Sequence, residues 1–129
     1  MVDAAGNAYV GGQTDGGSML ITFKYDGATG QPLWTARYSG VSNSHPTTLA
    51  IDAAGNAYAT SEFRNPDQSS GFAALKYDGA TSQQRWVAHY DGPANSTNAP
   101  AALALDAAGN AYVTGQTYST SLYPTKFWA

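Results

Sequence analysis

The stretch DAAGNAY at residues 3–9 returns unchanged at residues 52–58 and again at residues 106–112. Other landmarks keep the same order between these copies, because KYDGAT and a later tryptophan each occur twice. Self-similarity with a period of roughly fifty residues indicates a repeat architecture, in which each unit packs against the next. We therefore expect a single repeat module at residues 1–129, with units at about 1–48 and 49–102 and a partial unit at 103–129.

Short apolar runs separated by clusters of turn residues fill each unit, as is typical of β-strands. No stretch keeps a helical period for three turns. Named A to D along a unit, the predicted strands are TTLAID and AALALD for A, NAYVGGQT, NAYATSEF and NAYVTGQT for B, LITFKYD and AALKYD for C, and PLWTARY and RWVAHY for D, with a partial C strand in TKFWA. Four antiparallel strands in such a repeat are typical of a β-propeller blade. The sequence therefore predicts an all-β fold of such blades, about two and a half per chain.

The repeated DAAGN segment joins strand A to strand B, and DGATG or DGATS joins C to D. Asp opens a tight turn by accepting bonds from backbone amides, while Gly and Asn tolerate the left-handed conformation that closes it. A calcium loop is the alternative, because Asp and Asn oxygens suit a hard cation, but each turn offers only one carboxylate. We expect structural turns and no metal site.

Residues 106–125, DAAGNAYVTGQTYSTSLYPT, resemble the bacterial β-propeller repeat called the SBBP repeat, with the pattern D-x-x-G-N-x-Y-V-x-G-x-T followed by Ser and an aromatic-Pro pair. The first unit has Met19 and Leu20 in place of the aromatic-Pro pair, and the second departs after Tyr58. The resemblance implies a propeller fold and a bacterial protein that is extracellular or on the cell surface. It implies no particular activity.

A second segment, YDGATGQPLW at residues 25–34, resembles the tryptophan-docking segment of quinoprotein-type propellers. The second copy, YDGATSQQRW, lacks the second glycine. If this resemblance extended to function, it would imply a quinone cofactor, calcium and a catalytic acid facing the axis of a closed ring. Two and a half blades are too few for that ring.

The loops that join B to C and D to A differ between units, whereas the A-to-B and C-to-D turns are nearly identical. In an up-and-down sheet these two sets of connections lie at opposite ends of the strands, so a ligand site is expected at the divergent end. The candidate ligand-binding residues are Asn43, His45, Arg64, Asn65, Asp67, Asn95, Asn98 and Tyr118. These polar groups suit a glycan or a protein ligand, and solvation alone would also explain them.

Composition limits the other classes of function. The net charge is −3 and the cations are scattered, which disfavours nucleic acid, and no apolar run is long enough for a membrane span. The absence of cysteine excludes thiolate zinc sites, and His45 and His89 occupy unlike positions. Because the sequence has no nucleophile, zinc or phosphate-binding motif, and most aspartates belong to turns, we expect no enzymatic activity and no cofactor.

Aromatic residues repeat in register, at Tyr9, Tyr58 and Tyr112 in strand B and at Trp34 and Trp86 in strand D. Side chains at equivalent positions are expected to fill the same blade-to-blade interface each time. The incomplete terminal blades leave open faces, so we expect either self-association into a homo-oligomeric ring or a fibre, or a longer parent chain. A scaffold or binding module is the leading hypothesis. A lectin-like carbohydrate-binding ring and a fragment of a quinoprotein-type enzyme are the alternatives.

Overall fold

The structure, a computed structural model, describes residues 1–14, 19–40, 45–66, 69–92, 96–119 and 126–127. These residues form an all-β protein of antiparallel sheets, which confirms the all-β part of the predicted fold. Within the described part of the chain, no helix is long and apolar enough to cross a membrane.

The described residues form three sheets, which follow one another along the chain. The first sheet consists of β1 (Ala8–Gln13), β2 (Leu20–Tyr25) and β3 (Pro32–Tyr38). The middle sheet consists of β4 (His45–Ile51), β5 (Ala57–Arg64), β6 (Ser70–Tyr77) and β7 (Gln84–Tyr90). The last sheet consists of β8 (Ser96–Leu105), β9 (Ala111–Ser119) and β10 (Lys126–Phe127). Within each sheet, neighbours in space are neighbours in sequence, so the connections inside it are hairpins.

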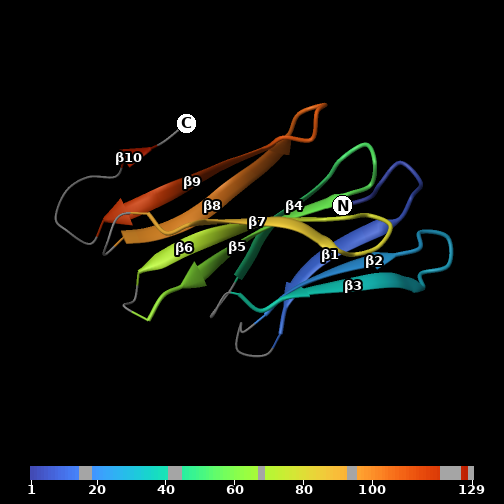
Figure 1. The fold of residues 1–129 in the computed structure, drawn as a ribbon, viewed down its shortest axis with the longest axis horizontal. Helices are drawn as coiled ribbons and strands as arrows, with labels where there is room; N and C mark the ends of the chain where they lie inside the picture. The colour runs from blue at the N-terminus through green and yellow to red at the C-terminus, as the bar shows by residue number, and fades with distance from the viewer. Residues whose placement is uncertain (15–18, 41–44, 67–68, 93–95, 120–125, 128–129) are drawn as a thin grey trace.

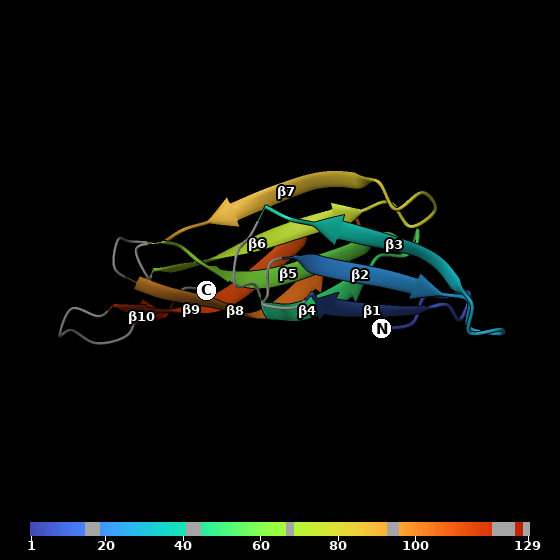
Figure 2. The same ribbon diagram turned by 90° about the horizontal axis from the view of Figure 1, so that it is seen from below.

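The sheets lie side by side in chain order, with the middle sheet between the other two (Figure 1). Strand β4 contacts both β1 and β8, so the first strands of successive sheets lie together. Figure 2 shows β3 and β7 at the opposite margin of the molecule. None of the sheets closes on itself in the described residues.

The hydrophobic core lies between the first and middle sheets. Its buried members are Tyr9, Leu20 and Ala36 from the first sheet, and Ala57, Ala59, Phe63, Ala73, Leu75 and Tyr77 from the middle sheet. Alanines on β5 and β6 leave room for the neighbouring sheet, while the large rings fill the space between the sheets. Burial of this apolar surface is the main force that holds the two sheets together.

Strand β8 begins at Ser96, earlier than the predicted start at Ala101. The reason is a bulge, because the pairing with β9 shifts register between Pro100 and Ala102. Proline cannot donate a ladder hydrogen bond, and a bulge lets the strand continue past it. Strand β4 has the same irregularity after Pro46, so a proline that suggested a loop lies inside a strand in both places.

The partial third strand predicted in TKFWA is present as β10. Lys126 pairs with Thr117 and Phe127 pairs with Gln116. Gln116 is the equivalent of Gln13, which pairs with Leu20 at the start of β2 in the first sheet. Phe127 pairs with Gln116 and so holds the position that corresponds to the start of β2.

Candidate functional site

Each DAAGNAY copy folds into the same turn, which its aspartate closes. Asp3 Oδ1 accepts hydrogen bonds from the backbone N–H groups of Ala5 at 3.0 Å and Asn7 at 2.8 Å. Gly6 has a φ of 84°, a conformation that glycine adopts without the steric cost of a Cβ. The same bonds recur at Asp52 and Asp106. The predicted role of these aspartates as turn residues is confirmed.

The second carboxylate oxygen of the same aspartate is also engaged. Asp3 Oδ2 accepts from Asn7 Nδ2 at 3.0 Å, lies 3.1 Å from the Tyr9 hydroxyl and pairs with Lys24 Nζ at 3.5 Å. Both oxygens therefore have partners within the turn and the adjoining strands, which favours a structural role over a calcium loop. Among the described residues, no three His, Cys, Asp or Glu side chains converge.

Tyrosines of the DAAGNAY copies connect successive sheets. The Tyr9 hydroxyl lies 2.9 Å from the carbonyl oxygen of Gly55 in the next DAAGNAY turn. The Tyr58 hydroxyl has the same contact with Gly109, also at 2.9 Å. Both tyrosines are almost completely buried. The same atoms thus join the first sheet to the middle sheet and the middle sheet to the last.

The KYDGAT segment provides a second connection between the first and middle sheets. Lys24 Nζ donates to the carbonyl oxygen of Gly79 at 3.1 Å, and Trp34 Nε1 donates to the same oxygen at 3.0 Å. Trp34 also meets the Tyr9 ring edge-on, with 5.8 Å between centroids. Lys24 lies over the Tyr9 ring at 5.1 Å, a cation–π geometry. These three side chains, together with Asp3, form one cluster, which we call the interface cluster.

The interface cluster changes the electrostatics of its members. Burial alone would raise the pKa of Asp3, but hydrogen bonds from Asn7 and Tyr9 and the charge of Lys24 outweigh it and lower that pKa to about 2. Burial also works against the charge of Lys24, yet its contacts with Tyr9 and Asp3 raise its pKa overall. The pKa of Tyr9 is raised, mainly by burial. At neutral pH the cluster is therefore a stable pair of opposite charges beside a neutral phenol.

The described members of the predicted ligand site lie at the end of the strands opposite the DAAGN turns. His45 starts β4 opposite Glu62, Arg64 ends β5 opposite Ser70, and Tyr118 lies near the end of β9. Figure 1 shows the β4–β5 and β8–β9 turns on the right and the β5–β6 connection on the left. Asn43, Asp67 and Asn95 lie outside the described residues.

Asn65 and Tyr118 of the predicted site form side-chain hydrogen bonds within the chain. Asn65 Nδ2 donates to Ser69 Oγ at 3.1 Å and helps to close the β5–β6 connection. The Tyr118 hydroxyl donates to Gln116 Oε1 on its own strand, and its ring is 46% exposed. His45 and Arg64 are exposed at the strand ends.

Asn98 corrects the expectation of a loop residue that faces solvent. It lies inside β8 and is completely buried. Its amide nitrogen donates to the carbonyl oxygens of Ser70 and Asp91, and its side-chain oxygen accepts from Thr117 Oγ1 at 2.8 Å. A buried amide needs such partners, so Asn98 fastens β8 to β6 and β9. Its position in a polar, divergent segment gave no sign of burial.

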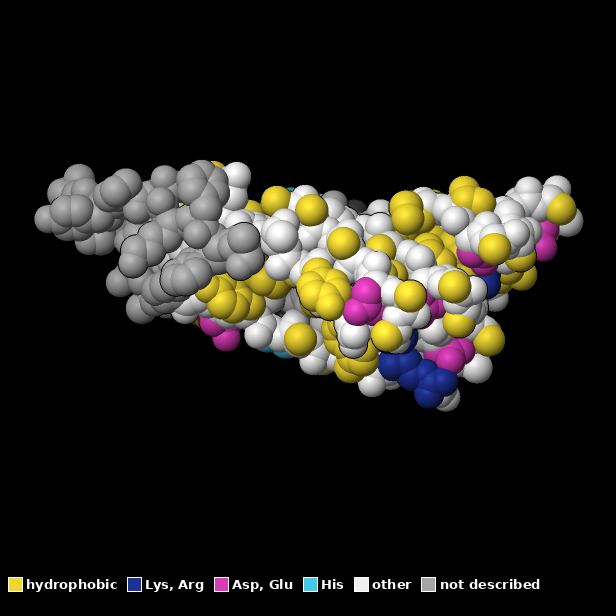
Figure 3. Space-filling model, turned by 90° about the horizontal axis from the view of Figure 1, so that it is seen from above, with side chains coloured by type: hydrophobic (Ala, Val, Ile, Leu, Met, Phe, Trp, Pro, Cys, Tyr) yellow, Lys and Arg dark blue, Asp and Glu magenta, His cyan; other side chains and the backbone are white. Residues whose placement is uncertain are grey.

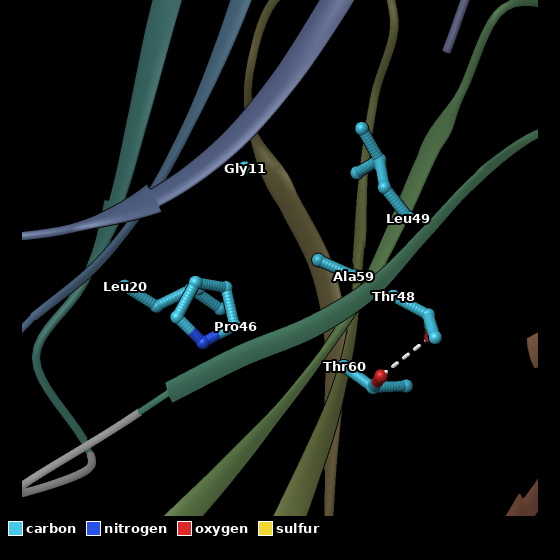
Figure 4. A pocket seen from close by; sticks show the side chains of 7 residues that line it. All are labelled: Gly11, Leu20, Pro46, Thr48, Leu49, Ala59 and Thr60. Atoms are coloured by element: carbon cyan, nitrogen blue, oxygen red, sulfur yellow. Dashed lines mark hydrogen bonds between the residues drawn. The ribbon is translucent and has the colours of Figure 1, made fainter. Parts of the chain in front are cut away.

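A small cavity lies between the first and middle sheets, with a volume of about 130 Å³. Figure 4 shows Gly11 and Leu20 on one side and Pro46, Thr48 and Thr60 on the other, with a hydrogen bond between the two threonine hydroxyls. Ligand pockets are usually larger, roughly 300 Å³ or more. We interpret this cavity as a gap in the packing between sheets.

A larger cavity, of about 370 Å³, lies between the middle and last sheets. It is lined by the turns at residues 52–56 and 106–109 and by Lys76. Lys24 and Lys76 were among the scattered cations in the sequence. Neither the place of Lys24 in the interface cluster nor the equivalent contacts of Lys76 with Asp52 and Tyr58 were predicted. The available signal was their identical position before Tyr25 and Tyr77.

No protein-family model matches the chain, and no curated protein matches it in sequence. The resemblance to the bacterial propeller repeat therefore stays a prediction that rests on residues 106–125.

Proposed function

We propose that this chain is a non-catalytic β-propeller repeat module that serves as a structural scaffold or a binding surface. The observation that carries the proposal is the repeated contact of Tyr9 with Gly55 and of Tyr58 with Gly109. An interface built twice from the same atoms is what stacked repeats require, since each unit contacts only its neighbours. The four antiparallel strands of the middle sheet, in the order β4-β5-β6-β7, match the composition of one blade.

The hydrogen bonds that the aspartates accept within the turns support a role without catalysis. Asp3, Asp52 and Asp106 each accept hydrogen bonds on both oxygens, and Asp26 and Asp78 hold the C-to-D turns through bonds from Thr29 and Thr81. General acid–base chemistry needs a carboxyl group that can reach a substrate. These five aspartates instead maintain the turns that position the interface cluster.

The outer sheets expose apolar side chains that a further unit would cover. Val10 and Leu33 of the first sheet are 48% and 50% exposed, and Tyr112 of the last sheet is 59% exposed. Figure 3 looks onto the last sheet from the side away from the first, and hydrophobic side chains lie open there between acidic and basic ones. Further units, from a longer chain or from other copies in a ring or fibre, would bury this surface.

The divergent end of the strands is the proposed binding surface. His45 and Arg64 are exposed there on adjacent strands of the middle sheet, and Tyr118 presents a ring from the last sheet. A cation, an imidazole and an aromatic ring suit a glycan or a polar protein surface. In this proposal the end of the strands that carries the DAAGN and DGAT turns stays the same in every unit, while the loops at the divergent end vary.

Sedimentation of the chain at about 10 µM, followed by electron microscopy of the particles, tests the proposal. We expect dimers, a larger ring or fibres, because covering a few hundred Å² of apolar surface contributes several kcal/mol at roughly 25 cal/mol per Å². Replacing Tyr112 with Glu should shift the distribution towards smaller particles, whereas Ala108→Glu, a charge added in the neighbouring exposed turn, serves as the control. A stable monomer of 13.4 kDa with a sharp unfolding transition would contradict the proposal.

A further inference from the structure

Three Asp-Gly sequences lie in the described part of the chain, at residues 26–27, 78–79 and 91–92. An Asp-Gly sequence is open to one particular reaction, because glycine has no side chain to keep its amide nitrogen away from the preceding carboxyl group. The nitrogen attacks Cγ of the aspartate and an N–C bond forms. The hydroxyl of the protonated carboxyl group leaves with the amide proton as water, and the product is a cyclic succinimide.

Hydrolysis of the succinimide then decides the form of the chain. Water adds to one of the two carbonyl carbons, and the bond from that carbon to the nitrogen breaks. Addition at the side-chain carbonyl restores aspartate, whereas addition at the main-chain carbonyl gives isoaspartate. In isoaspartate the chain runs through Cγ and is one carbon longer, and the former main-chain carbonyl is a free carboxylate. The water that leaves is regained, so the reaction needs no other reactant.

Two of the three aspartates are held by donors of their own turns. Asp26 Oδ1 accepts from the N–H of Thr29 at 2.8 Å and from its hydroxyl at 2.9 Å. Asp78 Oδ1 accepts the same two bonds from Thr81, each at 2.9 Å, and its other oxygen pairs with Arg85. The Thr29 N–H is the main cause of a lowered pKa at Asp26, and Arg85 has this role at Asp78. Both carboxyl groups are therefore fixed in place and rarely protonated.

Asp91, in the connection from β7 to β8, has different surroundings. It is exposed, and its carboxylate has no hydrogen bond or ion pair with another described residue. Its main-chain carbonyl oxygen, by contrast, accepts from the buried amide of Asn98 at 3.1 Å. Gly92 has a φ of 65°, and a Cβ there would overlap the Asn98 side chain. The fold therefore requires the glycine that makes this sequence reactive.

We propose that Asp91-Gly92 is a site of spontaneous isoaspartate formation in the folded chain, whereas the turns protect Asp26-Gly27 and Asp78-Gly79. The reaction lengthens the connection between the middle and last sheets by one carbon. It also converts the acceptor of the Asn98 amide from a carbonyl into a carboxylate. The modification thus alters the junction between two units, and it does not depend on what the proposed module binds.

The test is incubation of the full chain at neutral pH and physiological temperature, followed by trypsin digestion. Residues 25–37, 77–85 and 86–126 are separate tryptic peptides, so each site is followed in the same sample. Electron-transfer fragmentation distinguishes isoaspartate from aspartate. We expect the rate at Asp91 to exceed the rates at Asp26 and Asp78 at least about tenfold, because one hydrogen bond to a charged group can change a population by that factor. Equal rates in the folded chain overturn the inference.

The unfolded chain is the matched control. In guanidinium chloride the turns are lost, so the three rates should become similar, and a difference that persists there also overturns the inference. Asp91→Glu keeps the charge but needs a larger ring for cyclisation, so the signal at residue 91 should disappear. Thr81→Val removes one donor from Asp78 and should raise the rate at that site. An unchanged rate would contradict protection by the turn.

Discussion

Tyr58 and Tyr112 occupy the same position in two copies of one motif, yet one is 1% exposed and the other 59%. Both hydroxyls lie close to the aspartate of their own turn, at 3.2 Å in each case. The difference is the next DAAGNAY turn, which supplies the carbonyl of Gly109 to Tyr58. The motif thus encodes the donor, and the neighbouring sheet supplies both the acceptor and the burial.

The two tryptophans give the same comparison. Trp34 is partly buried and donates to the carbonyl oxygen of Gly79. Within the described part of the chain, Trp86 has the equivalent edge-on contact with the Tyr58 ring, at 5.9 Å, but no such hydrogen bond. The stability of a unit therefore depends on the contacts that the next unit supplies, as expected for a quasi-one-dimensional stack. Substitutions at equivalent positions should have unequal effects, and this inequality is what the following experiments measure.

The largest effect is expected from Gly79→Ala, which breaks the complete interface. A Cβ at this position would overlap the carbonyl oxygen of Gly55, a backbone atom that cannot move without opening the turn. We expect a loss of about 3 kcal/mol or more in the free energy of unfolding, at the upper end for single substitutions. Urea denaturation followed by circular dichroism measures it. Gly11→Ala, where a Cβ meets nothing within 4 Å, is the control and should change little.

The next effect is a loss of stability in acid. The pKa of Asp3 is lowered to about 2, and those of Asp52 and Asp106 are also lowered, so protons bind more weakly to the folded chain than to the unfolded one. The contribution of these groups is complete above the unfolded pKa of about 4 and is lost as the pH falls towards 2. Urea denaturation at pH 7, 4 and 2.5 should show this decline. Asp3→Asn should flatten it, and a parent whose stability is constant over this range would refute the role of the turns.

A smaller effect is expected at the tyrosines. Tyr58→Phe removes a buried hydroxyl that contacts two acceptors and should cost about 1 to 2 kcal/mol. Tyr112→Phe removes an exposed hydroxyl and should change the free energy of unfolding by less than about 0.5 kcal/mol. Both are measured in urea, at a protein concentration low enough to keep association constant. Equal losses would mean that the neighbouring sheet contributes nothing to this position.

The smallest effect is expected at the tryptophans. Trp34→Phe replaces the indole with a smaller aromatic ring and removes the hydrogen bond to Gly79, whose loss should cost about 1 kcal/mol. Trp86→Phe should be close to neutral in the chain by itself, because its N–H has no acceptor among the described residues.

Much of the fold could be predicted because the sequence repeats its turn chemistry. DAAGN and DGAT mark the ends of hairpins, and the strands between them lie where their apolar runs indicated. The second copy of the C-to-D turn has Ser82 in place of Gly30, and it keeps the left-handed conformation with a φ of 63°. The bonds that Asp78 accepts from Ala80 and Thr81 hold this turn without the glycine.

The parts that could not be predicted depend on contacts distant in sequence. Pro46 and Pro100 suggested loops, but bulges absorb them inside strands. Asn98 suggested a surface group because its segment is polar, and its burial depends on Ser70, which lies in another sheet. Lys24 and Lys76 were treated only as scattered cations. The role of Lys24 depends on the carbonyl of Gly79 in the next sheet, which no local pattern reveals.

The repeated tyrosines Tyr9 and Tyr58, and the Lys24–Trp34 pair, all contact backbone carbonyls of the next sheet along the chain. This polarity has a genetic consequence. Duplicating or deleting a DNA segment that encodes one whole unit places the same donor beside the same kind of carbonyl. The interfaces between sheets at the altered position therefore keep the same hydrogen bonds. A change by a fraction of a unit would set a donor against the wrong strand. We therefore expect an insertion or deletion of one whole unit to be tolerated better than a frame-preserving change of another length.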